Sequence, residues 1–400
     1  MLPAGAWSKP APQRPAAARP AAPPPIRIGE INSYKARPDL LDPYRKGWQL
    51  ALDEINEQGG VLGRKLQVLA RDDKGTADGA LAAAQQLAER EHVGLFLGGL
   101  YSEAALALAS YADQSQAFFL ATLPMSTRLT WEQGNNYTYR LAPSGWMQVA
   151  ALVPRAFGLR KRRWALVYPN DVYYGQPTAA AFRSMITSFQ SRTNIVSDQP
   201  VQPGRLNAKE LAHRLLQDKP DAIFSLLSGP DFVRFVHEAK EQGLLQNMAV
   251  VAPLAGRPET LQAMDADAEA GWLVSGNLCE PADAAGMQRF NQAYQARYGT
   301  APGSTSALGY IALKSVAEGL RKAGDASPQA VAAAFAGLNL DTPYGPVQFR
   351  ALDHQATLGV CLAVTAEENG HIVAQPTGYL DGSRLQPPDK SVHALRGKQQ

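Results

Sequence analysis

The chain has 400 residues, of which 45% are hydrophobic and 19% are charged, a composition typical of globular proteins. Its length favours two lobes or domains over a single compact core. The formal net charge is +3, and three basic side chains lie within the first 25 residues, which contain no acid. The remainder is therefore balanced in charge, which argues against nucleic acid as the main partner. No apolar run approaches the roughly 18 residues of a transmembrane helix.

Both ends of the chain are predicted to be disordered. Residues 1–25 are rich in proline and alanine and cannot bury a core, and residues 386–400 are interpreted in the same way. The first segment holds no apolar stretch of about 7–15 residues, so it is not a recognisable secretory signal peptide.

From Ile26 onward, short apolar segments alternate with segments of helical periodicity. In the first helix, for example, Trp48, Leu52 and Ile55 share one face, and a Gly-Gly pair ends the helix. The predicted strands are 26–31, 65–70, 93–99, 117–121, 163–169, 194–200, 221–227, 248–253, 271–276, 345–350, 357–364 and 371–375. The predicted helices include about 44–58, 77–90, 103–114, 284–298, 305–323 and one that begins at Pro328. Two runs of this alternation, separated near Pro143, predict two α/β lobes with parallel sheets.

Motifs for catalysis and for cofactor binding are absent. The sequence has no G-x-x-x-x-G-K-[ST] or G-x-G-x-x-G motif, no G-x-S-x-G elbow and no H-E-x-x-H motif. The histidines are scattered, and Cys279 and Cys361 form no C-x-x-C pair, so we expect neither a metal site nor a cofactor. The two cysteines are either buried thiols or one disulfide. Asp72 and Asp73 are interpreted as capping and loop residues rather than an acid–base pair.

Four loops after predicted strands carry polar or aromatic residues at the place where open parallel sheets bind ligands. They are residues 98–102, 121–126, 173–175 and 227–231. Ser102 is placed to cap a helix whose first amides and dipole attract an anion. One such motif alone favours simple helix capping, whereas four such loops in two lobes favour a ligand cleft.

Collinear segments that share a family pattern extend over roughly residues 26–380. One is INEQGGVLGRK, which is followed by a strand and then by the pair DD. Others are FLGGLYSEAALALA, WALVYPNDVYYGQ and DTPYGPVQFRALDHQATLG. On these segments the chain resembles the type I periplasmic solute-binding proteins of ABC importers, in the leucine/isoleucine/valine-binding group. The resemblance implies two Rossmann-like lobes with parallel central sheets joined by a three-strand hinge. Lobe 1 is then formed by residues 26–142 and 279–353, and lobe 2 by residues 143–278 and 354–385.

The resemblance places the three crossings near Ala142–Pro143, near Cys279 and near Asp353–His354. It implies that a small-molecule ligand closes the cleft by hinge motion and that an ABC permease in the membrane recognises the closed form. It also implies a periplasmic location, and we expect a monomer. A disulfide between Cys279 and Cys361, near two of the crossings, would stiffen the hinge.

The resemblance further implies a set of ligand-binding residues. In amino-acid-binding relatives the loops that match GGLYS and ATLPMS hold the ligand carboxylate, and a Tyr-Gly pair in lobe 2 closes over the ligand. The implied ligand-binding residues are Tyr101, Ser102, Thr122, Leu123, Pro124, Met125, Trp146, Tyr173, Tyr174, Ser228, Gly229, Asp231 and Leu254.

Leu254 departs from the family pattern, because relatives carry there a glutamate that pairs with the ligand ammonium. A buried ammonium without a carboxylate partner costs several kcal/mol. Either Asp231 supplies the charge, or the ligand has no ammonium. We favour the second interpretation, a small carboxylate or amide, aromatic or not, held by Tyr101, Tyr174 and Trp146. Trp146 is equally well interpreted as a core or hinge residue.

The sequence therefore predicts an extracytoplasmic solute-binding protein that delivers a small carboxylate, amide or amino acid to a permease. The alternative is a cytoplasmic ligand-sensing regulator with the same fold, which the lack of a recognisable signal peptide leaves open. We do not expect an enzyme, because the sequence shows no nucleophile–base signature.

Overall fold

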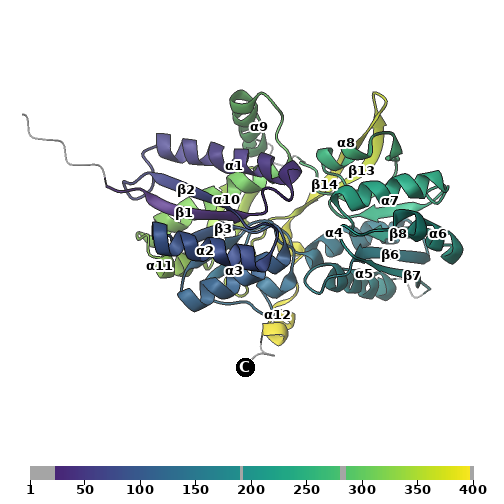
Figure 1. Ribbon diagram of the computed structural model, residues 1–400, viewed down its shortest axis with the longest axis horizontal. Helices are drawn as coiled ribbons and strands as arrows, with labels where there is room; N and C mark the ends of the chain where they lie inside the picture. Colours follow the sequence, from purple (N-terminus) through teal and green to yellow (C-terminus); the bar gives the residue numbers. More distant parts are fainter. Residues whose placement is uncertain (1–22, 190–191, 280–284, 397–400) are drawn as a thin grey trace, which may run out of the picture.

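The computed structural model describes residues 23–189, 192–279 and 285–396, which form two α/β lobes lying side by side (Figure 1). Lobe 1 contains a five-stranded, all-parallel sheet in the order β2-β1-β3-β4-β5. Its strands are β1 (Ile26–Asn32), β2 (Leu66–Asp72), β3 (Leu95–Gly98), β4 (Phe118–Ala121) and β5 (Thr138–Arg140). Its other elements are α1 (Pro38–Glu57), α2 (Ala77–Glu91), α3 (Ser102–Ser115), η1 (Thr127–Leu129), α9 (Ala285–Tyr298), α10 (Ser304–Ala323), α11 (Pro328–Phe335), β11 (Asn339–Thr342) and β12 (Gly345–Gln348).

The apolar strands of lobe 1 bury both of their faces, because successive side chains point to opposite sides of the sheet. Leu97 and Leu120 join the core under α1, α9, α10 and α11, whereas Phe96 and Phe119 join the core under α2 and α3. The helices α1 and α10 approach so closely that a Cβ added at Gly309 would lie 2.1 Å from the Tyr44 carbonyl oxygen.

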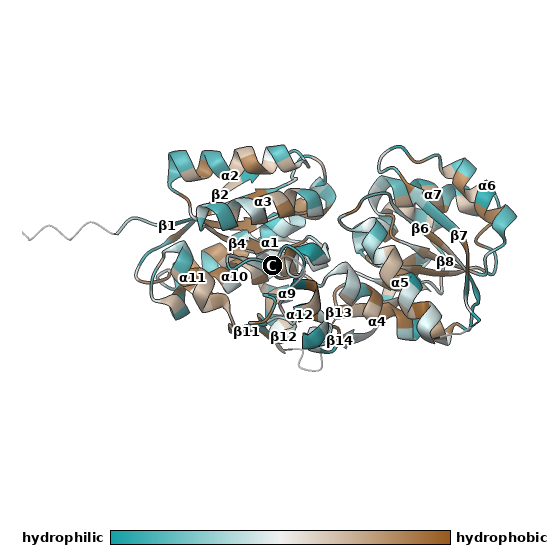
Figure 2. Cartoon of the chain, turned by 90° about the horizontal axis from the view of Figure 1, so that it is seen from below, coloured by the Kyte–Doolittle hydropathy of each residue, from teal (hydrophilic) through white to brown (hydrophobic). Residues whose placement is uncertain are grey.

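Lobe 2 contains a seven-stranded sheet in the order β14-β13-β10-β9-β8-β6-β7, in which β13 and β14 are antiparallel and the rest parallel. Its strands are β6 (Arg163–Pro169), β7 (Asn194–Val201), β8 (Ala222–Ser225), β9 (Ala249–Ala252), β10 (Leu273–Ser275), β13 (Val360–Glu368) and β14 (His371–Leu380). Its helices are α4 (Gly145–Gly158), α5 (Gly175–Phe189), α6 (Ala208–Asp218), α7 (Gly229–Glu241), α8 (Pro258–Met264) and η2 (Asp265–Asp267). Figure 2 shows hydrophobic residues concentrated on the central strands. The predicted α/β class with parallel sheets in two lobes is confirmed.

The chain passes between the lobes at the hinge. The first crossing follows β5 and enters α4, and the second runs from the end of β10 to Cys279, which packs in the core of lobe 1. In the third, Gln355 still pairs with Arg140 of lobe 1, and Val360 begins β13 of lobe 2. The ring of His354 also stacks on Tyr139 in lobe 1, with centroids 4.0 Å apart.

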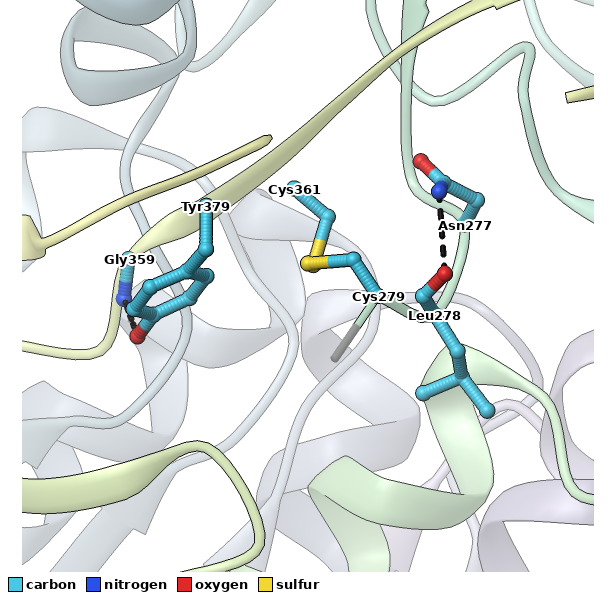
Figure 3. The surroundings of a disulfide bond; sticks show 6 residues. All are labelled: Asn277, Leu278, Cys279, Gly359, Cys361 and Tyr379. Atoms are coloured by element: carbon cyan, nitrogen blue, oxygen red, sulfur yellow. Dashed lines mark hydrogen bonds between the residues drawn. A yellow bond between two sulfur atoms is a disulfide. The ribbon is translucent and has the colours of Figure 1, made fainter. Parts of the chain in front are cut away.

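A disulfide between Cys279 and Cys361 joins the second and third crossings (Figure 3). The two Cα atoms are 5.8 Å apart. Of the two alternatives left open by the sequence, the structure thus shows one disulfide rather than two thiols. Close to it, the Gly359 amide donates a hydrogen bond to the Tyr379 hydroxyl oxygen at 2.7 Å.

The predicted disorder of residues 386–400 is wrong for most of that segment. After η3 (Gly382–Arg384), the chain forms the helix α12 (Asp389–Arg396). Leu385 packs in the core of lobe 2, whereas Arg396 donates a hydrogen bond to the Leu352 carbonyl in lobe 1. Val392 is fully buried. One buried apolar side chain in an otherwise polar segment is too little to predict a helix from the sequence. Most of the predicted N-terminal disorder, residues 1–22, lies outside the described residues.

Among the described residues, no helix is long and apolar enough to cross a membrane. Nor do these residues hold a group of three or more histidine, cysteine or acidic side chains suited to a metal ion.

Candidate functional site: a cleft between two lobes

A cavity of about 320 Å³ lies between the lobes, at the carboxyl ends of their parallel strands. Lobe 1 lines it with segments that follow β1, β2, β3 and β4, and lobe 2 with segments that follow β6, β7, β8 and β9. The lining residues are Arg37, Leu40, Gly75, Leu100, Tyr101, Ser102, Glu103, Leu123, Met125, Pro169, Asp171, Tyr173, Tyr174, Pro203, Leu226, Ser228, Pro253, Leu254 and Arg257. An apolar and aromatic wall with a few polar groups is usual for a small-molecule site.

The N-terminus of α3 presents free amide groups to this cavity. Tyr101 occupies the N-cap position with an extended backbone, and no side chain among the described residues caps the helix. The predicted capping role of Ser102 is therefore wrong: Ser102 is the first helical residue, and its Oγ accepts a hydrogen bond from the Ser126 amide at 3.2 Å. Because the first amides of a helix have no intrahelical acceptor and carry the positive end of its dipole, this end suits an anion.

The turn before α3 depends on two glycines with positive φ, Gly98 (φ 128°) and Gly99 (φ 78°). A Cβ at Gly98 would lie 2.1 Å from the Ile31 carbonyl oxygen, so only glycine lets the strand end there. Thr122 supports the same turn from β4, because its Oγ1 donates a hydrogen bond to the Gly98 carbonyl at 3.1 Å. Thr122 is fully buried and does not line the cavity.

A buried carboxyl group, Glu30, lies beneath this turn. Its Oε2 accepts a hydrogen bond from the Tyr34 hydroxyl at 2.5 Å, and its Oε1 accepts one from the Asn32 amide at 3.1 Å. Burial raises the pKa of Glu30 to about 8, from an ordinary 4.5. The sequence analysis missed Glu30, although an acid inside the apolar strand IRIGEI is a usable signal.

In lobe 2, Asp171 shapes the loop that carries the two predicted tyrosines. Its Oδ1 accepts hydrogen bonds from the amides of Tyr173 at 2.9 Å and Tyr174 at 2.6 Å. Its Oδ2 accepts one from the Gly175 amide at 3.1 Å. The carboxylate of Asp171 is thus committed to backbone amides, and it directs Tyr173 and Tyr174 toward the cavity that they line. Burial raises the pKa of the Tyr174 hydroxyl.

Arg257, in the loop after β9, lines the cavity although it was not among the predicted ligand-binding residues. Only 8% of its surface is exposed, and its Nε is buried without a hydrogen-bond partner in the part of the chain that the structure describes. Burial lowers the pKa of its guanidinium from the ordinary value. Leu254 lies in the same loop with φ 66°, and its amide donates a hydrogen bond to Ser275 Oγ at 3.1 Å.

A second arginine, Arg37, reaches the cavity from lobe 1. Its Nε and Nη2 donate hydrogen bonds to the Asp39 carboxylate at 2.9 and 2.6 Å. The guanidinium lies against lobe 2, since a Cβ at Gly229 would be 3.3 Å from its central carbon. Neither Arg37 nor Arg257 was predicted from the sequence. The sequence shows only that each lies in a loop after a strand, which does not distinguish them from surface arginines.

The structure brings eight of the predicted residues together at the cavity: Tyr101, Ser102, Leu123, Met125, Tyr173, Tyr174, Ser228 and Leu254. The other predicted residues do not line it; they are Thr122, Pro124, Trp146, Gly229 and Asp231.

Two of these exceptions bear on the ligand. Trp146 packs against Trp131, with ring centroids 6.0 Å apart, and lines a neighbouring cavity of about 270 Å³. Asp231 lies outside the lining of the cavity between the lobes, and its carboxylate accepts hydrogen bonds from the Gly204 amide at 2.7 Å and from Arg234 at 2.5 Å.

Two α/β lobes with a cavity at their facing strand ends define the class of binding proteins that close on a ligand by hinge motion. The family model named periplasmic binding protein matches residues 25–370, and the chain belongs to this family. A Leu/Ile/Val-binding protein homolog of Brucella abortus is 24% identical over 331 residues, which cover 79% of this chain and 82% of the relative.

Solved structures show the same fold. A solute-binding protein of an ABC transporter from Rhodopseudomonas palustris, in complex with 3,4-dihydroxybenzoic acid, is 21% identical with a TM-score of 0.80, over 91% of this chain and 99% of that one. A substrate-binding protein from Desulfitobacterium hafniense, in complex with Leu, is 26% identical with a TM-score of 0.72, over 88% of this chain and 99% of that one.

Proposed function

We propose that this protein is the extracytoplasmic solute-binding component of an ABC importer. It captures a small carboxylate, amide or amino acid in the cavity, closes its lobes on it as a monomer, and delivers it to a membrane permease. The observation that carries the proposal is the cavity itself, whose wall combines the free amides of α3 in lobe 1 with Tyr174 and Arg257 in lobe 2.

The charges of the cavity favour an acid over an amino acid. Of the two carboxylates that line it among the described residues, Asp171 is committed to three backbone amides, and Glu103 is exposed. Among the described residues, a buried ligand ammonium would find no free carboxylate in that interior and would lie near Arg257, both of which are unfavourable. We therefore favour a ligand that has a carboxylate and no ammonium.

The disulfide supports a location outside the cytoplasm, because disulfides form and persist in oxidising compartments. The same observation speaks against the alternative of a cytoplasmic ligand-sensing regulator. The motion of two lobes around a bound solute accounts for binding and transfer without a catalytic step.

The test is to identify the ligand that the protein retains. Mass spectrometry of small molecules released on denaturing the purified protein is expected to find an organic acid, and calorimetry with that compound is expected to show one binding site. A thermal-shift screen of aliphatic and aromatic acids beside leucine and valine gives an independent answer. Tight binding of leucine or valine with no response to any acid would overturn the preference for an acid, and no response to any compound would overturn the proposal.

A further inference from the structure

Hydrogen-bond donors that have no partner among the described residues lie at two places in the wall of the cleft. One place is the uncapped start of α3 in lobe 1, and the other is the guanidinium of Arg257 in lobe 2. Ser102 and Glu103 at the first place and Arg257 at the second all line the same cavity of about 320 Å³. The same wall includes the apolar side chains of Leu123, Met125 and Leu254.

Among the described residues, the Nε atoms of Arg45 and Arg257 are both buried without a hydrogen-bond partner, but the central guanidinium carbon of Arg45 lies 4.0 Å from the centroid of the Tyr34 ring. Besides Arg257, Arg140 is the other arginine that is at least nine-tenths buried among the described residues, and each nitrogen of its guanidinium donates a hydrogen bond. It donates hydrogen bonds to Gln355 Oε1 at 2.5 Å, to Thr130 Oγ1 at 3.1 Å and to the Ser126 carbonyl. Arg257 has no such set of partners among the described residues. Burial lowers the pKa of its guanidinium, and Glu259 and Tyr174 lie near enough to raise it in part.

Burial of a charged group without a partner is strongly unfavourable, so a guanidinium held in this way needs a reason. The planar guanidinium matches a carboxylate with two parallel hydrogen bonds, and such charge-assisted bonds are the strongest that a cavity can offer. Its position in the cavity wall means that a ligand can supply that carboxylate.

Building on the proposed function, we propose that the ligand is a diacid: one carboxylate binds the amides at the start of α3, and the second pairs with Arg257. The spacer between the two acidic groups is apolar and lies against the leucine, methionine and tyrosine side chains of the wall. In this arrangement each lobe holds one end of the ligand, so that the closed form requires both acidic groups.

The test is a calorimetric titration of the full chain, freed of retained ligand, with two matched pairs: terephthalate against benzoate, and glutarate against valerate. In the wild type, at least one diacid is expected to bind about 10-fold or more tighter than its monoacid, because hydrogen bonds between charged groups are the stronger kind. In Arg257→Met, which keeps an apolar stem, this preference is expected to disappear. The matched control is Arg214→Met, which removes an exposed arginine paired with Glu210 on α6 and is expected to leave the preference unchanged.

The outcomes separate this inference from the proposed function. Monoacids or leucine that bind the wild type as tightly as the diacids would overturn the diacid and leave solute binding intact. A diacid preference that survives in Arg257→Met would overturn the role of Arg257. If Arg257→Met fails to fold, Arg257→Lys replaces it; this variant keeps a charge without the planar fork and is expected to retain a weaker preference. Absence of binding by every compound would count against the proposed function itself.

Discussion

Glu30 illustrates at the residue scale how the cavity-lining turn before α3 is supported. Its carboxyl group is fully buried beside Asn32 and Tyr34, and a Cβ at Gly98 would lie 3.1 Å from its Oε1. With its pKa raised to about 8 by burial, the group is mostly protonated at neutral pH in the folded protein. The turn that leads to α3 thus lies on a neutral hydrogen-bonded cluster rather than on a negative charge, which would repel an anionic ligand.

The raised pKa of Glu30 makes folding stability depend on pH. Because the folded-state value of about 8 exceeds the ordinary 4.5, the stabilisation is complete below about pH 4.5 and is lost as pH rises toward 8. In Glu30→Gln, the fall in the free energy of unfolding between pH 5 and 8 is expected to be smaller than in the wild type, by about 1 kcal/mol per pH unit. Urea denaturation across that range measures it. Glu103→Gln, at an exposed position, is the control, and identical slopes in wild type and Glu30→Gln would contradict the expectation.

Leu254 offers a second residue-scale test, because it shares a loop and the cavity wall with Arg257. In Leu254→Glu the new carboxylate is expected to pair with Arg257 and to repel an acidic ligand. The affinity for benzoate or terephthalate, whichever binds the wild type, should fall about 10-fold or more by calorimetry. Leu254→Gln has the same shape without the charge and serves as the control. An equal loss in both variants would show that shape rather than charge is responsible.

At the scale of elements, the contact of α1 with α10 depends on small residues. Gly309 of α10 faces the backbone of α1 at Tyr44, and Gly47 of α1 faces the carbonyl of Ser306, where an added Cβ would lie 1.9 Å from its oxygen. Neither position has room for a methyl group unless the helices separate. The two helices cover one face of the lobe 1 sheet, so their separation would loosen that core.

Gly309→Ala is therefore expected to destabilise the protein by about 1–3 kcal/mol through overpacking, measured by chemical denaturation. Gly158→Ala is the matched control, because Gly158 lies in α4 with no other atom within 4 Å of an added Cβ. That change is expected to be neutral or to stabilise by up to about 1 kcal/mol. Equal stability of the two variants would mean that α1 and α10 adjust without strain.

The regular elements could be predicted from sequence where the apolar pattern is long. The strand predicted at 163–169 is found at the same residues as β6. The three-residue strand β5 was missed, because such a segment is too short to show a period. The helix α1 begins at Pro38 rather than near Tyr44, since Pro43 lies inside it and disguised its first turn.

The candidate site was predictable only in part. Loops such as 98–102 could be found because their position after a strand is a local property of the sequence. Burial of Arg257 without a partner could not, because it depends on which groups three-dimensional packing brings near the guanidinium. The commitment of Asp231 to Gly204 and Arg234 is a tertiary property in the same way.

At the scale of the whole molecule, the disulfide fixes two of the segments that run between the lobes. Cys279 and Cys361 are 82 residues apart in sequence, so their bond restricts the unfolded chain strongly. The double variant Cys279→Ser, Cys361→Ser is expected to lose about 2–4 kcal/mol of stability and to unfold at a lower temperature by calorimetry. A thiol assay of the denatured, unreduced wild type checks the bond directly. Two free thiols would remove the disulfide, and an unchanged unfolding temperature in the variant would contradict its stabilising role.

The C-terminal segment adds a further connection between the lobes. Leu385 lies in the core of lobe 2 and α12 lies against lobe 1, so the chain crosses once more after the sheets are complete. The Gln386 side chain donates a hydrogen bond to the Ala356 carbonyl of the third crossing at 3.2 Å. That third crossing is therefore joined to each of the others, by the pairing of Gln355 with Arg140, by the disulfide and by Gln386.

A single flexible segment would let two lobes rotate about any axis. Several cross-linked segments restrict the lobes to bending about one common axis. Twisting or sliding of one lobe against the other would strain all of them, and bending about their common line strains them least. The freedom that remains is close to one rotation, so that each opening and closing retraces the same path. For the membrane permease that we propose as the partner, such a joint gives the loaded state a single reproducible outline.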